Sequence, residues 1–78
     1  MSRVTFENWV VDALKYYKGK ATIIAVAKHI WENHSKEIET SDFFYTWQYD
    51  FRWAATSLRK SGIIKSANIS PKGVWELN

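Results

Sequence analysis

Residues 45–64, YTWQYDFRWAATSLRKSGII, decide the fold of this chain. A helix turns by about 100° per residue, and at that spacing the apolar and polar side chains fall on opposite faces. The apolar face consists of Phe44, Trp47, Phe51, Ala54, Ala55 and Leu58. The polar face consists of Tyr45, Gln48, Tyr49, Arg52, Thr56, Arg59 and Lys60. The sequence therefore predicts an amphipathic helix that packs one face on a core and turns the other outward.

Composition limits the chain to one small domain that is held together by packing. A chain of 78 residues buries only about 60–65% of its unfolded surface, so its core must be rich. Thirteen aromatic residues supply that core, and the absence of Cys excludes disulfides, thiolate zinc sites and cysteine nucleophiles. No apolar run approaches the roughly 18 residues of a membrane span, and no secretory signal is recognisable. We expect a single soluble domain, residues 1–78, in the cytoplasm and without a membrane partner.

Charge is distributed unevenly along the sequence. Residues 1–42 contain six basic and six acidic side chains, whereas residues 43–78 contain five basic and two acidic ones. The whole net charge of +3 therefore lies in the half that includes the amphipathic helix. This asymmetry favours an anionic partner for the C-terminal half.

Two further helices are predicted before residue 45. The first is capped by Thr5, follows the i, i+3, i+4 spacing of apolar residues, and ends at Gly19. The second is capped by Thr22 and stops near His34 or Ser35, because the apolar spacing then fails. Residues 36–43 are predicted to form a loop with at most one helical turn. The third helix begins between residues 43 and 46, with Ser41 or Thr46 as its cap, and runs to Lys60.

After Gly62 the sequence becomes strand-like. IIKSANI and VWEL predict two short strands around the turn SPKG, in which Pro71 presets φ and Gly73 tolerates positive φ. A short third strand is expected near residues 20–21. The fold class is therefore α+β, mainly α, with three helices followed by a two-stranded hairpin. This order is typical of a winged helix, in which the second and third helices form a helix-turn-helix and the hairpin is the wing.

The segment RWAATSLRKSGIIKSANISPKGVWEL resembles the amino-terminal winged-helix domain of Mrr-like restriction endonucleases. The matching positions, which cover about the last third of the chain, are Arg52, Trp53, Leu58, Arg59, Lys60, Gly62, Ile63, Ile64, Gly73, Val74 and Trp75. The resemblance implies DNA binding through the third helix and the wing. It does not imply catalysis, because the nuclease domain of those enzymes has no counterpart within 78 residues. We expect a free-standing relative or the front of a longer protein.

The polar face of the third helix is the main candidate site. Gln48 and Arg52 lie one turn apart, and their side chains can pair with adenine and guanine edges in the major groove. The candidate contacts to phosphates and sugars around them are Tyr45, Tyr49, Thr56, Arg59 and Lys60. The alternative is an ordinary solvated helix face, which the same composition also allows.

Basic residues outside that helix are secondary candidates. Lys65 and Lys72 lie in the predicted wing, where they suit either backbone phosphates or protection of an edge strand. Lys18, Lys20 and Thr22 cluster at the start of the second helix, where free N–H groups can bind a phosphate. Such a cluster is equally well explained as a helix cap and a solvated turn.

Other chemistry-bearing residues point to no active site. His29 and His34 are five residues apart, about 140° around a helix, and cannot share a metal. No pair of titratable residues has catalytic spacing, and no Gly-rich phosphate loop is present. We therefore expect no enzyme, no cofactor, no metal and no small-molecule substrate. Of the five Trp residues, four are expected in the core, and Trp53 is expected to be partly buried.

Two functions from different classes fit these features. The first is a module that binds double-stranded DNA through the third helix and the wing. The second is a winged helix for protein interaction or homodimerisation, with Trp53, Tyr45 and Tyr49 as anchors. A DNA-binding measurement distinguishes the two functions. Both can occur in one protein that binds a palindromic site as a dimer.

Overall fold

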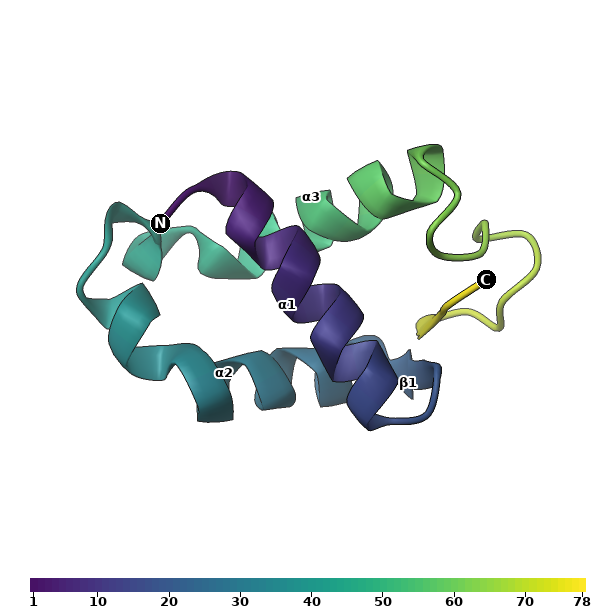
Figure 1. Cartoon of the computed structure of the whole chain (residues 1–78), viewed down its shortest axis with the longest axis horizontal. Helices are drawn as coiled ribbons and strands as arrows, with labels where there is room; N and C mark the ends of the chain where they lie inside the picture. The colour runs from purple at the N-terminus through teal and green to yellow at the C-terminus, as the bar shows by residue number, and fades with distance from the viewer.

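A computed structural model describes all 78 residues. In chain order its elements are α1 (Arg3–Tyr16), β1 (Lys20–Thr22), α2 (Ile23–Glu39), the 3₁₀ helix η1 (Asp42–Tyr45), α3 (Trp47–Lys60) and β2 (Val74–Glu76). α2 and α3 run along the two long sides of the molecule, and α1 lies across both (Figure 1). The mainly helical fold with a small antiparallel sheet agrees with the predicted α+β class. No helix of the chain is long and apolar enough to cross a membrane.

α1 begins earlier than the sequence predicts. Its N-cap is Ser2, and the hydroxyl of Thr5 accepts a hydrogen bond from the Ser2 N–H at 3.3 Å. The predicted cap at Thr5 is therefore wrong, because Thr5 is the third residue of the helix and supports the cap from inside. Past the other end, Lys18 and Gly19 both adopt positive φ, which reverses the chain toward β1.

α2 begins as predicted and ends later. The Thr22 hydroxyl accepts a hydrogen bond from the Ala25 N–H at 3.1 Å, which confirms the predicted cap. The predicted end near His34 or Ser35 is wrong, since the helix continues to Glu39 and buries Ile38 completely. The predicted loop at residues 36–43 is thus mostly helical.

α3 ends at Lys60, as predicted. The two residues predicted as alternative caps for its start belong to two different helices. Ser41 caps η1 by accepting from the Phe43 N–H at 3.1 Å, and Thr46 is the N-cap residue of α3. The connection from Thr40 to Thr46 is longer than the three- or four-residue turn typical of a helix-turn-helix.

The predicted core face of α3 is largely confirmed. Phe51, Ala54, Ala55 and Leu58 are buried among fourteen buried apolar residues that come mainly from the three helices. Trp47 is half-buried and stacks on Trp31 of α2, with ring centroids 5.5 Å apart. The placement of Phe44 in the core is wrong, because it lies on η1 and is 39% exposed.

The sheet joins segments that are distant in the sequence. β1 pairs antiparallel with β2 in the register Lys20↔Glu76, Ala21↔Trp75 and Thr22↔Val74. This confirms the short strand predicted near residues 20–21. The predicted strand IIKSANI is too long, because only Ile64 forms a bridge, to Leu77, and residues 66–69 then form a turn. The chain between Ile64 and β2 therefore consists mostly of turns.

Candidate nucleic-acid interface

The polar residues predicted for the third helix do lie together on the outer face of α3. Arg52 and its neighbours on this face are exposed; the full set on α3 is Gln48, Tyr49, Arg52, Thr56 and Lys60. Tyr45 lies just before them on η1 and is 89% exposed. The structure therefore places five of the seven predicted residues on the outer face of α3 and leaves Tyr45 exposed on η1.

α3 itself exposes no acidic side chain, and an acid at its edge, Glu32 of α2, lies across a groove from Gln48. Asp50, the one acidic residue of α3, is 4% exposed. One of its carboxylate oxygens accepts from Arg3 Nε at 3.0 Å, and the other accepts from the Thr46 hydroxyl at 2.7 Å. Its charge is thus buried and compensated, so the outer face of α3 presents cations, amides and hydroxyls only.

Arg3 is a residue that the sequence analysis did not select. Its guanidinium carbon lies 4.3 Å from the ring centroid of Trp53 and 5.3 Å from that of Tyr49. These distances are typical of cation–π contacts. Arg3 therefore joins the start of α1 to α3 by an ion pair and by two aromatic contacts. Trp53 is half-buried, as predicted, and lies at the edge of the outer face that meets α1.

Arg59 differs from the other predicted contacts on α3. The residue is only partly exposed, and its Nε is enclosed without a hydrogen-bond partner. An enclosed and unpaired guanidinium nitrogen is uncommon, because desolvating it without a partner is costly. Arg59 thus presents less of its charge to a ligand than Arg52 does.

The two lysines of the predicted wing have different surroundings. Lys65 is half-buried and pairs with Glu76 at 3.2 Å, and Ser70 donates a second hydrogen bond to that carboxylate at 3.3 Å. The hydrogen bond from Lys65 lowers the pKa of Glu76. Lys72 is exposed in the turn before Gly73 and makes no ion pair. Of the two, Lys72 is the side chain available to a ligand.

The cluster at the start of α2 is explained largely by the fold. The Thr22 hydroxyl is used as the helix cap. Lys20 lies opposite Glu76 in the sheet, and its charge helps to lower the pKa of Glu76. Lys18 is exposed. The structure gives these residues places in the cap, the sheet and the turn, and it does not place them on the outer face of α3.

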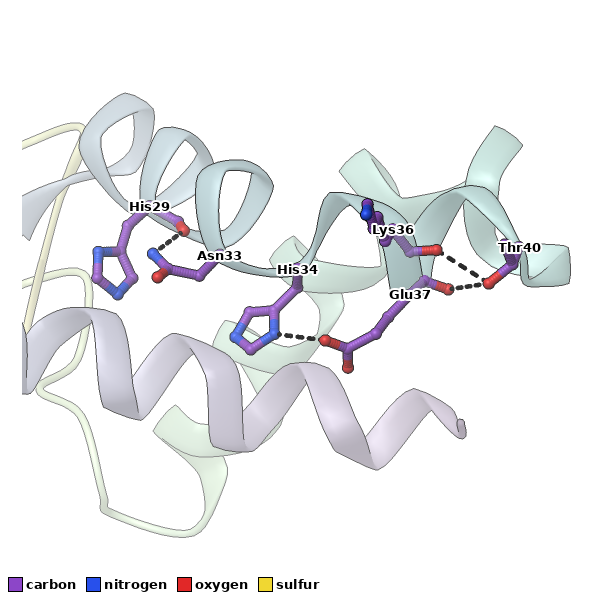
Figure 2. Close-up of polar contacts among 6 residues, drawn as sticks. All are labelled: His29, Asn33, His34, Lys36, Glu37 and Thr40. Carbon is purple, nitrogen blue, oxygen red and sulfur yellow. Dashed lines mark hydrogen bonds and ion pairs between the residues drawn. The ribbon is translucent and has the colours of Figure 1, made fainter.

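Both histidines lie on α2 and are engaged in local packing (Figure 2). The His34 ring stacks on Trp9 of α1 at 3.9 Å, and its Nδ1 lies 3.2 Å from a carboxylate oxygen of Glu37. The side-chain amide of Asn33 donates to the His29 carbonyl at 2.8 Å. No group of three or more acidic or histidine side chains is arranged to hold a metal ion.

A groove between α2 and α3 adjoins the outer face of α3. It has a volume of about 570 Å³, and the stacked rings of Trp31 and Trp47 form part of its wall. Gln48 lines it from α3, and Lys28 and Glu32 line it from α2. Gln48 therefore lies on the edge of α3 that faces α2, opposite to Trp53.

The geometry defines an exposed, acid-free face on one helix, with a further free lysine in the C-terminal turn. Comparison of the chain with protein-family models, curated proteins and solved structures found no match. The chemistry of the face is therefore the basis for a functional proposal.

Proposed function

We propose that the chain is a winged-helix module that binds double-stranded DNA. In this proposal α3 enters the major groove, and the C-terminal segment that includes Lys72 lies on the adjacent phosphate backbone. The observation that supports it most is the outer face of α3, which exposes Arg52, Gln48 and Lys60 and no carboxylate. The side chains of Arg and Gln can recognise base edges, and hydroxyl and ammonium groups beside them can bind phosphates.

The charge distribution supports the same proposal. Both acidic residues of the C-terminal half are in ion pairs, Asp50 with Arg3 and Glu76 with Lys65. The basic side chains of that half that make no ion pair are Arg52, Arg59, Lys60 and Lys72. The resemblance to the amino-terminal domain of Mrr-like restriction endonucleases also favours DNA as the partner.

A titration of labelled duplex DNA at low and moderate salt tests the proposal. We expect binding that weakens steeply as salt rises, because released counterions drive the association. Arg52→Ala should weaken binding strongly, and Arg59→Ala should weaken it less because part of that side chain is enclosed. Lys15→Ala, an exposed cation on α1, is the control and should bind as the unsubstituted chain does. Absence of binding at low salt would exclude the proposal.

A protein-interaction module is the second candidate. Tyr45 and Tyr49 are 89% and 66% exposed, and exposed aromatic side chains are enriched at protein interfaces. Trp53 suits this role less well, since it is half-buried under Arg3. Sedimentation of the chain alone and with duplex DNA distinguishes the two: a dimer that ignores DNA would favour the second candidate.

A further inference from the structure

A shallow hollow lies on the outer face of α3. It has a volume of about 420 Å³ and is lined by Tyr49, Arg52, Trp53 and Thr56. Three of these side chains have donors that make no hydrogen bond within the protein: the Tyr49 phenol, the Arg52 guanidinium and the Trp53 indole N–H. The Thr56 hydroxyl instead donates to the Arg52 carbonyl at 3.4 Å. No carboxylate lines the hollow. A site with several donors, one full positive charge and no acid is suited to an anion.

Arg3 completes the hollow from behind. Its guanidinium packs against the rings of both Trp53 and Tyr49, and its Nε binds the carboxylate of Asp50. This arrangement fixes both aromatic walls and neutralises the nearest carboxylate. The side chain is 38% exposed, and its terminal nitrogens make no hydrogen bond within the protein. The charge of Arg3 is balanced by Asp50, so Arg52 is the unpaired positive charge at the hollow.

We propose that this hollow binds one backbone phosphate of duplex DNA, with Arg52 as the charged contact and Tyr49 and Trp53 as neutral donors. Arg3 is a positioning residue that holds the two rings. The inference rests on the proposed function and refines it: it orients the duplex, assigns Arg52 to the backbone, and leaves the recognition of base edges to Gln48. One DNA strand would follow the edge of α3 that faces α1, and Gln48, on the other edge, would be directed toward the bases.

The test measures how duplex affinity depends on potassium chloride for matched variants. Each phosphate contact that is lost should reduce the slope of log K against log[salt] by about 0.9. We expect this reduction for Arg52→Gln, and no change in slope for the control Lys15→Gln. Tyr49→Phe should weaken binding several-fold without changing the slope, because it removes the phenol hydroxyl and keeps the ring and the charge. Arg3→Lys, which keeps the charge but not the planar stack, should shift the Trp53 indole N–H signal in NMR spectra and weaken binding.

A second arm identifies the phosphate. Replacing single backbone phosphates by neutral methylphosphonates should weaken binding of the unsubstituted chain at one position, and that effect should vanish in Arg52→Gln. If the duplex binds but Arg52→Gln and Tyr49→Phe leave slope and affinity unchanged, the hollow is not a phosphate site, and the proposed function stands without it. If inorganic phosphate shifts the Trp53 indole signal while neither variant affects duplex binding, the site binds a free anion and the inference fails. Absence of duplex binding by the unsubstituted chain would overturn both the inference and the proposed function.

Discussion

The burial of Asp50 determines the charge of the outer face of α3. A carboxylate in the first turn of a basic helix would normally weaken any anion-binding face. Here it is buried, and Arg3 and Thr46 satisfy its oxygens at 3.0 and 2.7 Å. The same contacts attach the first residue of α1 to the start of α3. Local stability and the charge of the outer face are therefore linked through one residue.

Removing Arg3 should destabilise the fold, because Asp50 would then be a buried charge with one remaining partner. A fully buried pair would cost about 3–5 kcal/mol. Arg3 is 38% exposed, so solvent screening reduces our expectation for Arg3→Ala to about 1–2 kcal/mol. Urea denaturation measures the change, and a double-mutant cycle with Asp50→Ala should give a coupling above about 0.5 kcal/mol. A change for Arg3→Ala no larger than that for Lys15→Ala would show that the pair is not stabilising.

Glu76 gives the fold a pH dependence whose sign is set by Lys65. The hydrogen bond from Lys65 lowers the pKa of Glu76 in the folded chain. A carboxyl whose pKa is lower when folded stabilises the fold above its unfolded pKa, and that stability is lost as pH falls through the folded value. We therefore expect the free energy of unfolding to fall in acid over this interval, and Glu76→Gln to lack that part of the dependence. Carboxyl NMR titration of Lys65→Met should show the pKa of Glu76 returning toward its ordinary value; an unchanged pKa would contradict the assignment to Lys65.

At the scale of elements, α2 is the largest difference between the sequence prediction and the structure. Ser35, Lys36, Glu37 and Glu39 made residues 36–43 look like a loop. Ile38 is nevertheless fully buried, and it continues the four-residue spacing of Val26, Ile30 and His34. A helix that buries one side chain per turn leaves the rest polar, so composition alone conceals it. The four-residue spacing of these side chains is the sequence pattern that predicts the last turn of α2.

The last turn of α2 can be tested by substitution at Ile38. We expect Ile38→Ala to lower the free energy of unfolding by about 2–4 kcal/mol, because it leaves a cavity in the core. Ile24 lies at the other end of the same helix and is 71% exposed, so Ile24→Ala should cost under about 0.5 kcal/mol. Similar small losses at both positions would mean that α2 does not pack on the core beyond Ser35.

The two faces of α3 were predictable, and the contacts between helices were not. The opposition of Phe51 and Leu58 to Arg52 follows from local periodicity, which one sequence is enough to show. The ion pair of Arg3 with Asp50 joins residues 47 positions apart and depends on how α1 crosses α3. The same limit applies to the pairing of β1 with β2, since no local pattern defines the register of distant strands.

At the scale of the whole molecule, the fold separates charge more sharply than the sequence does. The molecule measures 36 × 21 × 17 Å; α3 runs along one long side of it, and the C-terminal segment lies at the end of the molecule where α3 stops (Figure 1). Of the exposed acidic side chains without an ion pair, Asp12 lies on α1, Glu32 and Glu39 on α2 and Asp42 on η1, and none lies on α3. Both acids of the C-terminal half are paired, so its positive excess is available to an approaching polyanion.

The central claim is that α3 and the C-terminal turn form a DNA-binding surface. An amide chemical-shift map of the chain, recorded with and without a short duplex at low salt, tests it most directly. We expect shifts at Gln48, Tyr49, Arg52 and Thr56 and around Lys72, and little change on the opposite surface of α1. No shifts at low salt, or shifts confined to that surface of α1, would contradict it.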